Sequence, residues 1–142
     1  MIVVISRGDG GVSIMNVQPG EDADRAVAHW RMAAPEGYVS HATAQARDIP
    51  ADRTFRNAWK PDLTTDMARA RGIWRDRIRA ARQPRLAALD IAALRAIEEK
   101  NDPRLAEIII EKQALRDATN DPAIDAASTP EELRAAWPVI LR

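Results

Sequence analysis

The segment TDMARARGIWRDRIRAARQPRLAALDIAALRAIEEKNDPRLAEIIIEKQAL, from Thr65 to Leu115, decides the fold. Thr65 and Asp66 supply helix-capping oxygens at its start, and apolar residues then recur at spacings of three and four, which place them on one helix face. That apolar stripe holds Met67, Ala70, Trp74, Ile78 and Ala81, and after Pro84 it continues through Leu86, Leu89, Ala93 and Ile97, with Ile91 and Leu94 widening it. Proline lacks an N–H and its ring collides with the carbonyl four residues back, so we expect a kink or a short break at Pro84.

A turn at Asn101-Asp102-Pro103 divides this segment into two helices. Asp102 is expected to cap the second helix, because proline suits the first helical position that follows. Leu105, Ile108, Ile109 and Leu115 share one side of that helix. Ile110 falls partly off that side, so the apolar arc is wide and needs cover from more than one neighbour.

The two helices differ in length. At about 1.5 Å per residue the first, over 66–99, spans about 50 Å and the second, over 103–117, about 22 Å. The second helix can therefore cover only the part of the first that follows Pro84. We expect the apolar groups at Trp74 and Ile78 to pack on the N-terminal half of the chain or on a second chain.

The residues before this segment predict a small β-β-α-β unit. Two β-branched runs flank a Gly-rich tip, a pattern typical of a β-hairpin. The expected elements are strands over 2–5 and 12–17, a helix over 21–33, a turn at Pro35-Glu36-Gly37 and a third strand over 38–43. A polar, irregular connector follows, and Phe55 and Trp59 are expected to anchor it to the sheet.

Near the end of the chain, Asn120-Asp121-Pro122 predicts a break. Thr129-Pro130-Glu131-Glu132 predicts the start of a short helix, because the threonine can cap it and Glu132 can reach back to the cap. We predict an α+β fold in three parts: a small α+β domain with its connector over 1–62, a helical arm over 63–119, and a C-terminal link with one short helix over 120–142.

Composition excludes several functions. The 142 residues carry 21 basic and 21 acidic side chains, and zero net charge argues against general attraction to nucleic acid or anionic lipid. The absence of cysteine excludes a disulfide framework, a thiol nucleophile and a cysteine-ligated zinc site. No apolar run has the length of a membrane span or of a signal peptide, so we expect a soluble product.

No motif predicts an enzyme, a cofactor or a metal. Arg7-Gly8-Asp9 spells an integrin-type tripeptide, but turn chemistry explains all three residues. The glycines at 8, 10 and 11 lack the Lys-Ser/Thr and the helix that a phosphate-binding loop requires. His29 and His41 are the only imidazoles in the sequence, and their spacing does not predict a metal site.

The first half of the long helix is strongly basic. Seven arginines and two aspartates between Asp66 and Arg85 give a net charge of +5. The arginine-bearing face of this helix has three interpretations. It is exposed to solvent, it pairs with acidic groups of a partner, or it binds nucleic acid through Arg75, Arg79 and Arg82. Trp74 is either an interface anchor or packed on the N-terminal sheet, and Trp137 either docks the end of the chain or contacts a partner. The residues that we expect to bind a partner are Trp74, Arg75, Ile78, Arg79, Arg82, Ile110 and Trp137.

Five strings together resemble small proteins of tailed phages and prophages, encoded among tail and tail-fibre genes. They are Ala51–Trp59, Arg75–Arg79, Leu86–Asp90, Lys112–Asp117 and Thr129–Leu133, the last leading to Trp137-Pro138. The later half is similar to tail-fibre assembly chaperones, in which a helix carrying Gln-Ala-Leu-Arg-Asp precedes a terminal Trp-Pro element. The link after Asp117 is rich in Ala and Asp, whereas those chaperones have a short proline-rich stretch.

This resemblance implies a helper without enzymatic activity that binds a phage tail or tail-fibre protein in the cytoplasm of the bacterial host. The departure at the link leaves a structural component of the mature virion tail as the alternative. A homodimer or higher homo-oligomer would also cover the stripe at Trp74 and Ile78. A nucleic-acid-binding protein that uses the arginine helix is the third interpretation.

Overall fold

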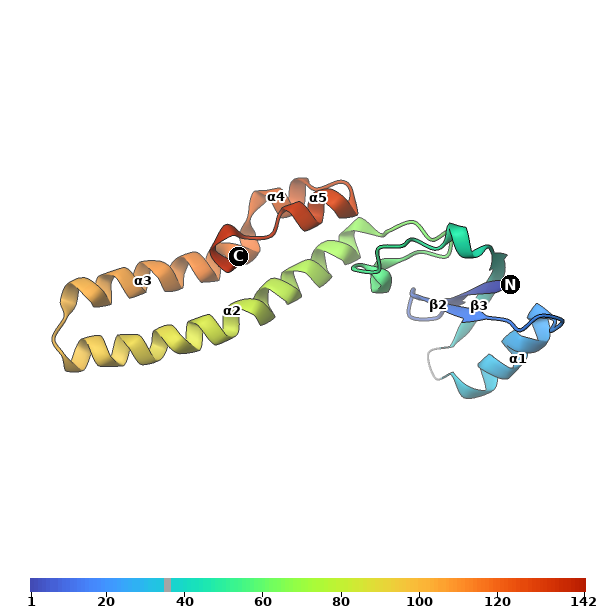
Figure 1. Cartoon of the computed structure of the whole chain (residues 1–142), viewed down its shortest axis with the longest axis horizontal. Helices are drawn as coiled ribbons and strands as arrows, with labels where there is room; N and C mark the ends of the chain where they lie inside the picture. Colours follow the sequence, from blue (N-terminus) through green and yellow to red (C-terminus); the bar gives the residue numbers. More distant parts are fainter. Residues whose placement is uncertain (35–36) are drawn as a thin grey trace. The chain divides into compact units, whose positions relative to one another are not determined.

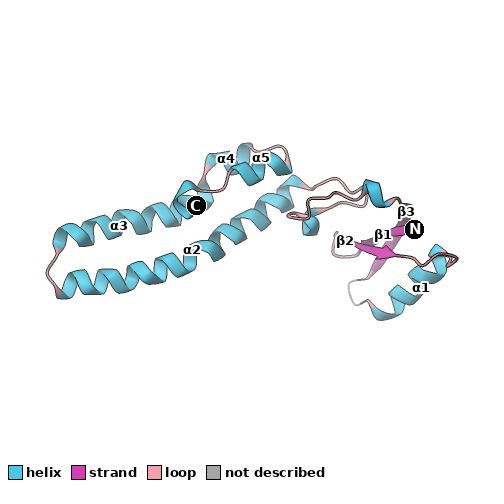
Figure 2. Ribbon diagram, in the orientation of Figure 1, coloured by secondary structure: helices cyan, strands magenta, loops and turns pink. Residues whose placement is uncertain are grey.

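The computed structural model describes residues 1–34 and 37–142, and its fold is α+β, as predicted (Figure 1). A three-stranded antiparallel sheet with one helix comes first, and a long helix, a helical hairpin and short helices follow (Figure 2). The chain divides into two compact units, Met1–Ala70 and Arg71–Arg142, so the predicted C-terminal link shares a unit with most of the helical arm. Pro35 and Glu36 of the predicted turn lie outside the described residues.

The sheet has the strand order β2-β1-β3. Its strands are β1 (Ile2–Arg7), β2 (Val12–Asn16) and β3 (Tyr38–Ala44), and helix α1 (Ala23–Ala33) connects β2 to β3 in the sequence. Gly10 has a φ of 78° at the tip between β1 and β2, a conformation that glycine adopts without a Cβ penalty. The predicted β-β-α-β unit is therefore present.

Alternation along β1 gives the sheet two apolar faces. Val3 and Ile5 pack with Val27 of α1 on one face, whereas Val4 packs with Val12 and Trp59 on the other. The second face is covered by the connector, which contains the 3-10 turns η1 (Ala46–Asp48) and η2 (Arg56–Ala58). Phe55 and Trp59 are each only 2% exposed, which confirms that both are buried anchors of this connector.

Helix α2 runs from Met67 to Glu98 without a break, although Pro84 lies inside it. Figure 1 shows the helix changing direction in its middle, so of the two expected outcomes the bend is present and the break is not. Asp66 accepts hydrogen bonds from the N–H groups of Ala68 and Arg69 at 3.0 and 3.2 Å and so begins the helix.

Helix α3 (Asp102–Asp117) returns beside the second half of α2. Asn101, and not Asp102 as expected, caps it by accepting a hydrogen bond from the Arg104 N–H at 3.1 Å. Lys100 takes a left-handed φ of 53° directly before this cap, and the turn lies one residue earlier in the sequence than predicted. Leu89, Ala96, Ile108 and Leu115 form the buried core of the hairpin.

Four short elements complete the chain: η3 (Ala118–Asn120), α4 (Pro122–Ala126), α5 (Pro130–Ala135) and η4 (Val139–Leu141). The capping box predicted for α5 is present, since Thr129 accepts from the Glu132 N–H and the Glu132 side chain accepts from the Thr129 N–H. Helix α4 is a new element within the predicted link. Asp121 caps it, Pro122 is its first residue, and its five residues are too few to show helical periodicity.

Two isoleucines of α3 that are two residues apart provide a matched test of the hairpin core. Ile108 is fully buried and Ile110 is 71% exposed. We expect Ile108→Ala to lower the free energy of unfolding by about 2–5 kcal/mol, because it leaves a cavity, and Ile110→Ala to change it by less than about 0.5 kcal/mol. Urea denaturation followed by far-UV circular dichroism measures both, and equal effects would contradict the assigned burial.

Candidate partner-binding site

The apolar stripe at the start of the long helix is covered by the chain itself. Trp74 is 7% exposed and Ile78 is fully buried. The Trp137 ring meets the Trp74 ring edge-on, with centroids 5.1 Å apart and planes 70° apart. The expectation that this stripe packs on the N-terminal half or on a second chain is therefore wrong.

The cover is the C-terminal segment, residues 118–142. Because α3 is short, the chain leaves it beside the middle of α2 and continues along the first half of α2 as α4 and α5 (Figure 1). Ile124 of α4 and Leu133 of α5 are both fully buried, which gives these short helices an apolar side. The second helix is indeed too short to cover this stripe, and residues 118–142, which were not predicted to cover it, do so.

Arginines of α2 hold this segment through its backbone. Arg71 donates to the Ala127 carbonyl at 2.9 Å, and Arg75 donates to the Thr119 carbonyl at 3.2 Å. Arg82 donates to the Leu115 and Arg116 carbonyls at 3.3 and 2.7 Å, and Arg85 to the Ile140 carbonyl. We call Arg71, Arg75, Arg82 and Arg85 the clamp arginines. Their spacings of four, seven and three place them along one helix stripe.

The acceptors explain why arginine is used here. The last carbonyls of a helix have no intrahelical partner and carry partial negative charge. Leu115 and Arg116 lie in the last turn of α3, and Ala127 directly follows α4. The clamp arginines thus supply donors to carbonyls at or near helix ends, and one carboxylate contributes, since Arg75 pairs with Asp125 at 2.7 Å.

The other basic residues of the helix are also engaged by the chain. Arg79 pairs with Asp76 at 2.6 Å, and the Arg77 guanidinium lies 5.9 Å from the centre of the Trp74 ring. Arg69 donates to the Gly10 carbonyl at 2.6 Å. Of the residues predicted to bind a partner, Arg75 and Arg82 therefore hold the C-terminal segment, whereas Arg79, half exposed at its side chain, does not.

A second apolar surface lies on the hairpin and is open. Five large aliphatic side chains are more than half exposed there: Ile91, Leu94 and Ile97 on α2, and Ile109 and Ile110 on α3. Asp90 forms an ion pair with Lys112 across the hairpin. Leu94 and Ile97 follow Asp90 at helical spacings of four and seven, and Ile109 precedes Lys112 by three, so these three residues flank the same edge of the hairpin.

We call these five exposed residues together the hairpin patch: Leu94, Ile97 and Ile109 at this edge, and Ile91 and Ile110 on the outer sides of the hairpin. Only Ile110 of this patch was predicted from sequence to bind a partner, because the apolar groups of α2 after Pro84 were expected to contact α3. The buried contact instead uses Leu89 and Ala96, with Leu86, Ala92 and Ala93 partly buried beside them. A patch of this kind on a protein surface is typical of a binding site.

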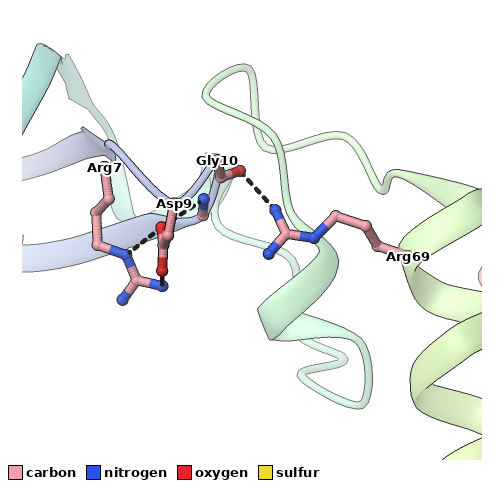
Figure 3. Close-up of polar contacts among 5 residues, drawn as sticks. Arg7, Asp9, Gly10 and Arg69 are labelled. Carbon is pink, nitrogen blue, oxygen red and sulfur yellow. Dashed lines mark hydrogen bonds and ion pairs between the residues drawn. The ribbon is translucent and has the colours of Figure 1, made fainter. Parts of the chain in front are cut away.

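The charged side chains of the Arg7-Gly8-Asp9 tripeptide bind each other (Figure 3). Arg7 donates two hydrogen bonds to the Asp9 carboxylate, at 2.9 and 3.1 Å, and the Gly11 N–H donates to the same carboxylate at 2.9 Å. The Gly11 N–H and then Arg7 lower the pKa of Asp9 below its usual value. Arg69 holds the same tip at Gly10, so turn chemistry accounts for these residues.

One polar cluster had no sequence signal. The Tyr38 hydroxyl lies 2.8 Å from His41 Nδ1, and the Asp24 carboxylate lies 3.1 Å from His41 Nε2. These contacts connect β3 to α1. They could not be predicted from the sequence, because Asp24 is far from Tyr38 and His41 along the chain. Among residues 1–34 and 37–142 there is no group of three or more His, Cys, Asp or Glu that could hold a metal ion.

Comparison with known proteins gives no family: no family model, curated protein or solved structure matches the chain significantly. Within the described residues, none of the helices combines the length and the apolar character that crossing a membrane requires.

The clamp can be tested with two arginines one turn apart. Arg75→Gln removes the bonds to Thr119 and Asp125, and we expect it to destabilise the unit Arg71–Arg142 by about 1–2 kcal/mol. Arg79→Gln removes only an exposed pair within α2, with an expected effect below about 0.5 kcal/mol. Amide hydrogen exchange over residues 118–141 should accelerate in the first variant alone, and unchanged exchange in Arg75→Gln would contradict the clamp.

The start of α5 should depend on pH through Glu132. Hydrogen bonds from the Ser128 N–H and hydroxyl, and then from the Thr129 N–H, lower the pKa of Glu132 below its ordinary value of 4.5. A carboxylate with a depressed pKa in the folded state stabilises it above pH 4.5, and this contribution is lost as the pH falls through the lowered pKa. Protection of the Leu133 amide should therefore fall below pH 4.5 in the native chain, whereas Glu132→Gln should lose part of it already at neutral pH.

Proposed function

We propose that this chain is a non-enzymatic assembly protein that binds a protein partner through the hairpin patch. The observation that carries this proposal is the exposure of five aliphatic side chains, each between 55% and 71%, on a hairpin whose own core is already filled. Further packing within the hairpin would not cover them, whereas the apolar face of another protein would.

The partner that we propose is a tail or tail-fibre protein of a bacteriophage. The support for this is the resemblance of the strings between residues 51 and 138 to phage tail-assembly proteins. An assembly chaperone must hold an apolar surface of its client until that surface finds its place in the tail. A rigid hairpin with aliphatic groups on its outside is suited to this, because aliphatic contacts are strong in sum and not directional.

The proposed binding surface differs from the one expected from sequence. Trp74, Ile78 and Trp137 are engaged with one another or buried, so we assign them to the closure of the arm. Ile110 remains a binding residue, and the other members of the hairpin patch join it. The action would take place in the cytoplasm of the bacterial host during tail assembly.

Capture of the client tests this proposal. The chain is co-expressed with the tail-fibre protein encoded in the same gene cluster, and the complex is isolated by affinity capture. We expect Leu94→Asp/Ile110→Asp to reduce capture at least about tenfold, because two carboxylates would be buried without partners. Val39→Asp is the matched control, since Val39 is a 62% exposed aliphatic residue of β3 outside the patch.

Two outcomes would contradict the proposal. Undiminished capture of the client by the double variant would exclude the hairpin patch as the binding surface. Light scattering that shows a dimer of the native chain, which Leu94→Asp/Ile110→Asp converts to a monomer, would assign the patch to self-association. The presence of the chain in purified phage particles, detected by mass spectrometry, would replace the transient role with a structural one.

A further inference from the structure

A small cavity lies on the face of the sheet that carries Val4 and Trp59, and it is independent of the hairpin patch. Its volume is about 210 Å³, and its apolar wall consists of Ile2, Ile14 and Ile49. Ile14 and Ile49 also pack against the buried Val4 cluster, so this wall continues the core of the unit Met1–Ala70. At about 30 Å³ per water the space equals about seven waters, enough for one branched aliphatic group with a carboxylate.

The polar wall of the cavity is positively charged. It consists of Arg53, Arg56 and Asn16, and none of the residues that line the cavity is acidic. Within residues 1–34 and 37–142, neither guanidinium forms a hydrogen bond or an ion pair with another side chain. Two cations without a counter-charge beside an apolar wall favour an anion that also carries an apolar group.

Two carboxylates of the connector are engaged in its own turns. Asp48 accepts a hydrogen bond from the Gln45 N–H at 2.9 Å, and Asp52 accepts from the N–H and the hydroxyl of Thr54 at 2.9 and 2.6 Å. Both acids therefore stabilise turns of the connector.

The backbone beneath the two arginines is fixed. The Arg56 N–H donates to the Arg53 carbonyl at 3.1 Å, and this turn is followed by η2. Phe55 lies between the arginines in the sequence and is 2% exposed, and Ala58 at the end of η2 is fully buried. This anchoring fixes the backbone that carries Arg53 and Arg56 at the cavity, and both arginines are exposed and accessible to a ligand.

We propose that this cavity binds a carboxylate carried on a branched aliphatic group. The three isoleucines contact the aliphatic part, and Arg53 and Arg56 donate charge-assisted hydrogen bonds to the carboxylate oxygens. The same chemistry is offered by a free branched-chain acid and by the C-terminal residue of a peptide that ends in leucine. The site is separate from the hairpin patch and does not depend on the proposed client.

Titration of the ¹⁵N-labelled full chain with 4-methylpentanoate tests this proposal. Saturable shifts are expected at the backbone amides of Ile14, Asn16, Ile49 and Arg56. The neutral amide 4-methylpentanamide, which lacks the charge, and acetate, which lacks the aliphatic group, should each bind at least about tenfold more weakly. A peptide ending in leucine is titrated in parallel, with its carboxyl terminus free or amidated. Tighter binding of the free peptide assigns the site to a chain terminus, and binding of 4-methylpentanoate alone assigns it to a free acid.

Variants separate this site from a general effect of charge. Arg53→Gln/Arg56→Gln should weaken binding of the preferred carboxylate at least about tenfold, whereas Arg47→Gln/Lys60→Gln, which removes two charges from the same connector outside the cavity, should not. Ala46→Phe should also weaken it, because Ala46 lines the cavity and the larger ring would fill it. No saturable binding of either carboxylate, equal binding of the amides, or equal loss in the two charge variants would overturn the proposal.

Discussion

The contact between the first half of α2 and the C-terminal segment is the interaction on which the rest of the arm depends. An apolar stripe of α2 extends beyond the reach of α3, and without cover it would leave Trp74 and Ile78 in water. The segment after α3 supplies that cover with Trp137 and with two short helices whose buried residues are Ile124 and Leu133. Burial of these apolar side chains drives the C-terminal segment onto α2, and hydrogen bonds from the clamp arginines fix its position there.

The clamp arginines solve a problem that short helices create. A helix of five or six residues leaves most of its carbonyls without an intrahelical partner, and packing such a helix against another would bury them at a cost. Guanidinium groups from α2 reach such a carbonyl at Ala127, directly after α4, and also reach carbonyls of α3, η3 and η4. The basic character of this helix is therefore explained within the chain, which removes the main reason to connect it with nucleic acid.

Because the C-terminal segment covers the first half of α2, the hairpin formed by the second half of α2 and α3 is the part of the arm left to bind a partner through apolar groups. The first half of α2 is covered by the C-terminal segment, whereas the hairpin beyond Leu89 exposes aliphatic groups on its outer sides. The exposed patch and the covered stripe are made of similar residues, and only the path of the chain distinguishes them. This is why the proposed site retains Ile110 and gains Leu94, whereas Trp74 and Ile78 are assigned to the closure of the arm.

Local patterns in the sequence were sufficient for the elements but not for their partners. The β-β-α-β unit, the two long helices and the capping box of α5 all follow from spacing and turn chemistry. The clamp could not be predicted, because backbone carbonyls leave no trace in residue identity, and α4 was missed because five residues show no period. Likewise, helical spacing shows that Leu94 and Ile97 of α2, and Ile109 of α3, belong to apolar arcs. It does not show which side of each helix packs against the other helix.

The most direct test of this account is a nuclear Overhauser measurement between the Trp74 and Trp137 indole rings in a mixture of differently labelled copies. The account predicts a strong effect within each copy, independent of concentration, because the ring centroids lie 5.1 Å apart in one chain. An effect that appears only between copies, or no effect together with a solvent-exposed Trp74, would contradict closure of the arm by its own C-terminal segment.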